Sequence, residues 1–129
     1  LTQQEADCID SGKIERFFQT EIGRLILHAD RVEREVMFGI HIPAREAESG
    51  YEGSEQIMLQ GVIDCVIICS GEITILDYKT EHVISEQKIA EKYAVQLEYY
   101  ARAAQLLYRL PVTKRIIYLF ETEKILYLN

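Results

Sequence analysis

The sequence reads GVIDCVII over residues 61–68 and ITILDYKT over residues 73–80. Both segments are rich in residues that favour strands, and the Ser70-Gly71 pair between them is typical of a tight turn. They are therefore predicted to form an antiparallel hairpin, with strands over 57–69 and 72–79. Each strand carries one aspartate in apolar surroundings, where an ionised carboxylate is costly unless it is paired or bound to a cation.

The two aspartates, Asp64 and Asp77, are expected to meet at the open end of this hairpin. Asp64 shares its predicted face with Val62 and Val66, and Asp77 shares its face with Lys79. Two like charges about 4 Å apart repel by ~4 kcal/mol at an effective dielectric constant of 20, and a divalent cation would turn this repulsion into attraction. Oxygen ligands favour Mg²⁺ or Mn²⁺. Lys79 could then orient or deprotonate a water molecule and stabilise charge on a phosphate.

Helices are predicted before and after this hairpin in the sequence. A capping box at Thr2 starts the first one, and helical spacing of apolar residues gives two or three short helices up to His28. Ser85 can cap a long helix that runs to about Leu110, because Pro111 prevents its continuation. Small apolar residues form the stripe of this helix: Ala90, Ala94, Leu97, Ala101 and Ala104.

Three more strands complete the predicted sheet. From Arg34 to Pro43 apolar residues alternate with others, which places Glu35 on the face opposite to the apolar one. Residues 44–56 are polar and lack any period, so they are predicted to form a surface loop. Two short strands follow the long helix, over 114–120 and 124–128. This order of elements predicts an α/β (mixed α+β) fold with a mixed sheet.

Composition limits the classes of function. The 129 residues fit one domain, and no apolar run is long enough to span a membrane or to act as a secretory signal, so a cytoplasmic location is expected. The three cysteines are expected to be reduced. A net charge of −7 argues against a free-standing nucleic-acid binder, so any contact with DNA must be local, metal-assisted or helped by another protein.

Four ordered blocks resemble one known family: RVEREVMF at 31–38, LQGVIDCV at 59–66, ILDYKTE at 75–81 and YAVQLEYYARA at 93–103. Together they resemble the PD-(D/E)xK nuclease superfamily and its RecB-like nuclease domains, in particular the C-terminal nuclease domains of AddA-type (RexA) helicase–nuclease subunits. The resemblance implies a restriction-endonuclease-like core, in which a central mixed sheet is flanked by helices. It also implies a Mg²⁺-dependent DNA exonuclease, with Mn²⁺ as a possible substitute.

The resemblance assigns roles to particular residues. Asp64 and Asp77 match metal ligands, the Tyr78 carbonyl a further ligand, Lys79 the catalytic lysine, and Glu35 an acidic position of the same site. Residues on the long helix are expected to bind substrate or support the site. Gln96 and Tyr100 match a QxxxY motif and share one helical face because they are four residues apart, and Tyr93 falls near that face.

The same resemblance implies a larger assembly. Residues 1–129 would be a single nuclease domain, the C-terminal part of an ATP-dependent helicase–nuclease that acts in double-strand break repair and homologous recombination. Its partners would be a DNA end and an AddB/RexB-like subunit. The family's metal-binding histidine, in a Gly-x-x-x-His context, is absent, so we expect the chain to begin after the helix that carries it. The family's DYKTD reads DYKTE here, and Glu81 receives no functional role.

Two other interpretations stay open. The chain could be a non-catalytic module that keeps the nuclease fold to dock a partner, and its acidity fits a surface that faces protein. It could also be a stand-alone Cas4-like exonuclease, although the four-cysteine cluster of such proteins is missing. The retained pair of aspartates and the lysine distinguish the catalytic interpretation from the docking one.

Overall fold

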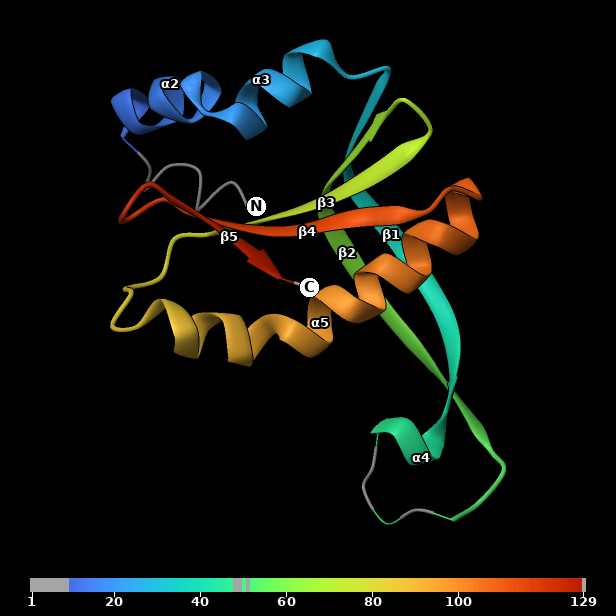
Figure 1. Ribbon diagram of the computed structural model, residues 1–129. Coiled ribbons are helices and arrows are strands. Elements are labelled where there is room, and N and C mark those ends of the chain that lie inside the picture. The colour runs from blue at the N-terminus through green and yellow to red at the C-terminus, as the bar shows by residue number, and fades with distance from the viewer. Residues whose placement is uncertain (1–9, 48–49, 51, 129) are drawn as a thin grey trace.

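The computed structural model describes residues 10–47, 50 and 52–128, which form one five-stranded sheet flanked by helices (Figure 1). The strands lie in the order β1-β2-β3-β4-β5. Only the β3–β4 pair is parallel among the four pairs of neighbours, so the sheet is mixed as predicted. The strands are β1 (Arg31–Pro43), β2 (Gln56–Cys69), β3 (Glu72–Lys79), β4 (Val112–Leu119) and β5 (Lys124–Leu128). The helices are α2 (Ser11–Gln19), α3 (Glu21–His28), α4 (Ala44–Ala47) and α5 (Glu86–Tyr108).

Local signals explain where these elements begin and end. The Ser85 side chain accepts a hydrogen bond from the Lys88 amide and caps α5, as predicted. The helix ends at Tyr108, because Arg109 adopts a left-handed conformation ahead of Pro111. A surface loop was expected over residues 44–56, but its first residues form a one-turn helix, α4, directly after β1. The predicted helix start at Thr2 lies outside the described residues.

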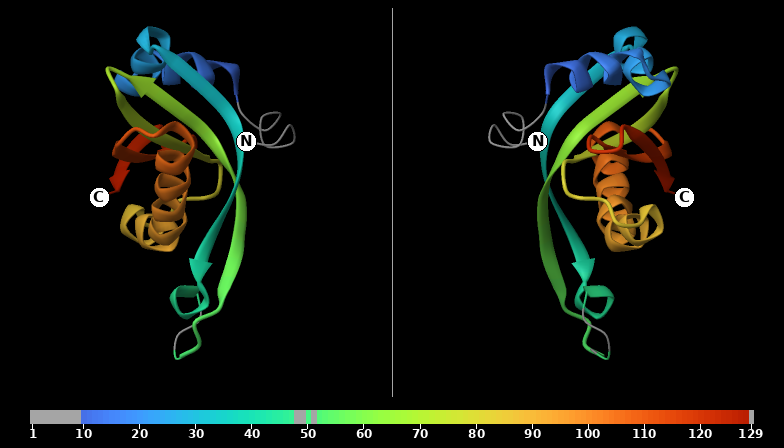
Figure 2. Two further views of the ribbon diagram at one scale, coloured as in Figure 1. Left: turned by 90° about the vertical axis from the view of Figure 1, so that its right-hand side faces the viewer. Right: turned by 90° about the vertical axis from the view of Figure 1, so that its left-hand side faces the viewer.

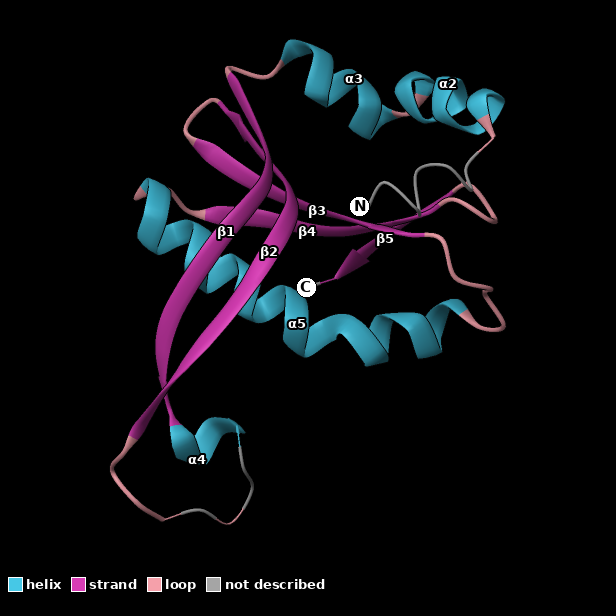
Figure 3. Cartoon of the chain, turned by 180° about the vertical axis from the view of Figure 1, so that it is seen from behind, coloured by secondary structure: helices cyan, strands magenta, loops and turns pink. Residues whose placement is uncertain are grey.

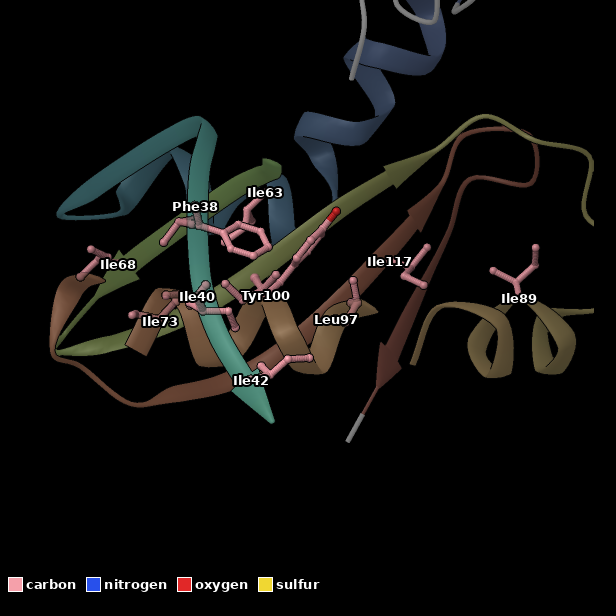
Figure 4. Packing of buried hydrophobic residues seen from close by; sticks show 14 of the residues in the cluster. Phe38, Ile40, Ile42, Ile63, Ile68, Ile73, Ile89, Leu97, Tyr100 and Ile117 are labelled. Carbon is pink, nitrogen blue, oxygen red and sulfur yellow. The ribbon is translucent and has the colours of Figure 1, made fainter. Parts of the chain in front are cut away.

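The two faces of the sheet are covered by different helices (Figures 1 and 2). Helices α2 and α3 cover one face, where Phe17 closes a cluster with strand residues such as Leu76 and Tyr118. Helix α5 covers the other face and lies in the concave side of the curved β1–β2 ribbon (Figure 2). Figure 4 shows this second core, in which Leu97 and Tyr100 of α5 meet the strands.

The apolar stripe of α5 differs from the predicted one. Leu97 and Ala104 are buried as expected, whereas Ala94 is exposed. The buried face runs instead through larger residues and is completed near the C-terminal end of the helix by small ones. Its buried members are Ile89, Leu97, Tyr100, Ala103 and Ala104. The buried face therefore passes through Tyr100 rather than through the neighbouring Ala101, which is only half-buried.

The β1–β2 ribbon changes face at Glu35, which has a left-handed backbone with φ of 52°. Before this residue, Val32 packs on the α2/α3 side of the sheet, and after it Phe38 packs on the α5 side. The two residues are an even number of positions apart, so regular alternation would place them on the same side. On the neighbouring strand Ile63 packs on the α5 side and Cys65 on the other. A strand of regular alternation would keep such pairs on one face. The long ribbon is seen from behind in Figure 3.

This change of face corrects the prediction for Glu35. A regular strand would have directed it away from the core face, together with Met37. Because Glu35 is left-handed, the consecutive side chains of Glu35 and Val36 both lie on the α5 side of the sheet. Glu35 therefore lines the same cleft as Asp64. Irregularities of this kind in a strand re-aim side chains and are frequent next to active sites.

No helix in the described part of the chain is long and apolar enough to cross a membrane. Cys65 and Cys69, the cysteines within that part, are free thiols, in line with the expectation of reduced cysteines. Burial raises the pKa of Cys65 to about 11, which keeps this thiol protonated and unreactive in the core.

Candidate active site

The open end of the β2–β3 hairpin brings Asp64 and Asp77 together. The strands pair antiparallel with Cys65 opposite Leu76, so the next position places the two aspartates opposite each other. The two carboxyl groups share a hydrogen bond, and Asp64 Oδ2 also accepts one from the Tyr78 amide at 2.9 Å. Asp77 is only 3% exposed, whereas Asp64 is half-buried at the edge of the core.

Burial and mutual repulsion disfavour the ionisation of Asp77 in this pair. Burial raises the pKa of Asp77 to about 7, the hydrogen bond and the charge of Asp64 add to the shift, and Lys79 opposes it. Burial also raises the pKa of Asp64, but hydrogen bonds outweigh it, those from Asp77 and the Tyr78 amide among them, and the net shift is downwards. Two carboxylates in one apolar site disfavour each other's ionisation, and the charge of Lys79 offsets part of this effect.

Lys79 lies beside this pair on the same face of β3. Its Nζ atom is 2.9 Å from Asp77 Oδ2, and its side chain is 18% exposed. Among the described residues, Asp77 Oδ2 has no hydrogen-bond partner of good geometry, so the lysine supplies charge rather than a well-directed hydrogen bond. A buried carboxylate oxygen that can still accept a hydrogen bond is also the kind of ligand atom that a hard cation such as Mg²⁺ binds.

Tyr93 of α5 approaches Lys79 from the other side. The Lys79 Nζ atom lies 3.9 Å from the centroid of the Tyr93 ring, within the range of a cation–π contact. The Tyr93 hydroxyl donates a hydrogen bond to Glu81, and Glu81 also forms an ion pair with Lys92 at 3.3 Å. The hydrogen bond from Tyr93 is the largest of the effects that lower the pKa of Glu81.

These residues surround a cleft of about 590 Å³. The cleft collects carboxylates from three strand positions, one lysine and two tyrosines of α5, although these lie far apart in the sequence. Its lining residues are Glu35, Val62, Asp64, Asp77, Tyr78, Lys79, Thr80, Glu81, Tyr93 and Tyr100. The size suits a small polar group such as a phosphate with its immediate neighbours, and the charges call for a cation.

The two motif residues of α5 are placed differently. Tyr100 lines the cleft, and its ring meets Phe38 edge to face at 5.5 Å, a packing that the missing side chain of Gly61 permits. Burial first, and then the charges of Asp77 and Asp64, raise the pKa of Tyr100 to about 12. Gln96 is not among the lining residues, and its buried Oε1 has no hydrogen-bond partner within the described part of the chain.

The donor set fits Mg²⁺ through two carboxylates. In the described residues no group of three or more His, Cys, Asp or Glu side chains is close enough to hold a metal ion by itself. Mg²⁺ does not require such a group, because it is often bound by one or two carboxylates, several waters and substrate phosphates. Asp64 and Asp77 supply those carboxylates, and Glu35 lines the same cleft. The ligand role of the Tyr78 carbonyl stays a prediction.

Three lining residues received no role from the sequence: Val62, Thr80 and Glu81. Glu81 is the most informative, because it binds both Tyr93 and Lys92. Its spacing offers a signal, since Glu81 comes two residues after Lys79 and four after Asp77, just beyond the end of β3.

An acidic pair beside a lysine, at the end of a hairpin in a mixed sheet flanked by helices, defines a core of the nuclease class. A family model for the PD-(D/E)XK nuclease superfamily matches residues 5–127. The chain belongs to this superfamily, and its sheet and flanking helices form the expected restriction-endonuclease-like fold.

Similar proteins are named as the A-type subunits of ATP-dependent helicase/nucleases. The protein from Acetivibrio thermocellus is 38% identical over 98% of this chain and 11% of its own length. That from Clostridium kluyveri is 38% identical over 100% of the chain and 11% of its length, and that from Oceanobacillus iheyensis is 35% identical over 95% and 10%. The chain thus spans about a tenth of the length of the curated relatives it matches.

Proposed function

We propose that this chain is a Mg²⁺-dependent DNA nuclease domain that hydrolyses phosphodiester bonds. The observation that carries the proposal is the convergence of Asp64, Asp77 and Lys79 on one cleft in a member of a nuclease superfamily. A purely structural hairpin end would gain nothing from a buried acid pair that shares one proton, since burying such groups costs free energy. A cation and a phosphate compensate this cost.

The residues divide the chemistry among them. Asp64 and Asp77 would hold Mg²⁺ (or Mn²⁺), which when bound supplies positive charge at a phosphate and a more acidic water. Lys79 lies within 2.9 Å of Asp77 and can orient the attacking water or donate to a phosphate oxygen. Glu35 can add negative charge that favours the cation, and Tyr100 forms the wall toward the core.

The relatives suggest the larger setting. Their name combines an ATP-dependent helicase with a nuclease, and the chain matches about a tenth of their length. We therefore place it in a longer bacterial cytoplasmic protein, where a helicase part would deliver a single-stranded DNA end for exonucleolytic cleavage during double-strand break repair and recombination. Because the net charge is −7, we expect such delivery to require an AddB/RexB-like partner.

One observation favours a second candidate, a docking module without catalysis. Within the described residues the site offers no group of three metal-ligating side chains, which gives it fewer ligands than a closed metal site. In that case the acid pair would keep its shared proton, Lys79 would neutralise the remaining charge, and millimolar Mg²⁺ would not bind.

Calorimetric titration of Mg²⁺ and Mn²⁺ distinguishes the two candidates. We expect binding to the full-length protein that carries this chain, and its loss in Asp77→Ala, together with loss of cleavage of single-stranded DNA. Glu72→Ala is the matched control, because Glu72 lies exposed at the opposite end of the same strand and should bind metal normally. Equal metal binding and cleavage in wild type and Asp77→Ala would overturn the proposal.

A further inference from the structure

Lys79 is the only cation among the described residues that line the cleft. Its amine stands at the end of a flexible four-carbon stem, so an ion pair alone leaves much of its rotamer freedom. In the proposed function Asp77 must also serve a metal ion, which makes it a poor sole anchor for the lysine. The position of the amine therefore depends on a second contact.

The Tyr93 ring supplies that contact. Its centroid lies 3.9 Å from Lys79 Nζ, on the side of α5, while Asp77 Oδ2 lies 2.9 Å from the same atom on the side of the sheet. The amine is thus held between a carboxylate and the face of an aromatic ring. Because the lysine side chain is mostly buried, water screens this ring contact less than it would at the surface.

The ring is itself fixed at its far end. The Tyr93 hydroxyl donates to Glu81 Oε1, and Glu81 Oε2 lies 3.3 Å from Lys92 Nζ. Glu81 follows β3 by two residues, so this hydrogen bond ties α5 to the segment that carries Lys79. A ring held at its backbone and at its hydroxyl presents one face to the amine with little freedom to turn.

We propose that Tyr93 is a positioning residue that directs the Lys79 amine into the cleft, and that Glu81 anchors the Tyr93 ring for this task. This inference rests on the proposed nuclease function, since it gives Lys79 a reacting phosphate to serve. Neither residue needs to touch substrate. Tyr93 acts through its ring, and Glu81 acts through the hydroxyl of Tyr93.

The test compares the ring with its anchor in the full-length protein. Tyr93→Leu removes the ring, and we expect kcat for cleavage of single-stranded DNA to fall about tenfold while KM changes little. Tyr93→Phe keeps the ring and should restore most of this loss, to within about threefold of wild type. Glu81→Ala should have the same kcat as Tyr93→Phe. The double variant Glu81→Ala/Tyr93→Phe should lose no more kcat than either single variant, because both changes remove the same hydrogen bond.

A matched control and a second measurement separate positioning from damage to the fold. Tyr99→Leu makes the same change on the same helix, away from the cleft lining, and should leave kcat near wild type. Nuclear magnetic resonance of the Lys79 side chain reports the ring directly, since its terminal methylene protons should be shifted upfield in wild type and Tyr93→Phe but not in Tyr93→Leu.

Each outcome decides one of the two proposals. Unchanged kcat in Tyr93→Leu, with cleavage still abolished by Asp77→Ala, would overturn the positioning role and leave the nuclease function standing. Equal losses of kcat in Tyr93→Leu and Tyr99→Leu would also overturn it. The role of Glu81 would be overturned if the losses of kcat in Glu81→Ala and Tyr93→Phe multiplied in the double variant. Cleavage that survives Asp77→Ala would overturn the proposed function and this inference with it.

Discussion

The two faces of the central sheet use their buried residues in different ways. Toward α2 and α3 the sheet carries aromatic rings, and the Phe17 ring centroid lies 4.7 Å from that of Tyr118 and 5.6 Å from that of Tyr78. Toward α5 it carries mostly aliphatic side chains until the open end of the hairpin, where Asp64 and Asp77 interrupt them.

The division runs between neighbouring residues of one strand. Leu76 is packed in the aromatic cluster, and Asp77, the next residue, is 3% exposed on the opposite face beside the cleft. The aromatic face therefore supplies stability that the acidic face gives up, since ionising a buried carboxylate is unfavourable. Proteins often place such costs at functional sites, where the rest of the fold offsets them.

The largest expected effect breaks the aromatic face. Phe17→Ala removes a ring that is 3% exposed and contacts Tyr78, Tyr118 and Phe120, so the free energy of unfolding should fall by about 4 kcal/mol. Urea denaturation measures the change. Phe18→Ala, one residue further along the same helix and 36% exposed, should cost far less. Similar losses for both would show that the face has no special role in stability.

The next effect concerns the acidic face and its pH dependence. Burial raises the pKa of Asp77 to about 7, whereas an unfolded aspartate has a pKa near 3.8. Between these values the unfolded chain has released the proton and the folded chain has not, so rising pH favours unfolding. In metal-free protein, stability should fall by about 4 kcal/mol between pH 4 and pH 8.

Asp77→Asn should remove most of that pH dependence. The variant should match wild type near pH 4 and be the more stable protein at pH 8, in denaturation curves recorded with a chelator present. Glu72→Gln, an exposed change on the same strand, serves as control and should leave the wild-type pH profile in place. A wild-type protein of equal stability at pH 4 and pH 8 would contradict a shared proton at this site.

Much of the acidic face could be predicted from sequence, for reasons that particular residues make clear. Asp64 and Asp77 stand in apolar strands on both sides of Ser70-Gly71, and a tight turn leaves little freedom in how such strands pair. Lys79 follows from alternation along β3. These positions depend on local periodicity, which a single sequence displays directly.

The contributions of distant segments could not be predicted in the same way. The pairing of Tyr93 with Lys79 and Glu81 depends on how α5 lies against the sheet. The same packing decides which face of α5 is buried, and it leaves Ala94 exposed. Propensity and periodicity describe each element by itself and contain no information on the angle between two of them.

The smallest expected effect sharpens the comparison at Glu35, where the ribbon changes face. A non-glycine residue with φ of 52° costs about 1–2 kcal/mol, and glycine avoids that cost but loses about 0.5–1 kcal/mol through the entropy of the unfolded chain. Glu35→Gly should therefore stabilise the protein by about 0.5 kcal/mol, as measured by urea denaturation, while weakening Mg²⁺ binding in the same titration used for Asp77. His41→Gly, at a regular exposed position of the same strand, should destabilise it instead. A loss of stability in both variants would mean that the left-handed conformation of Glu35 carries no net strain.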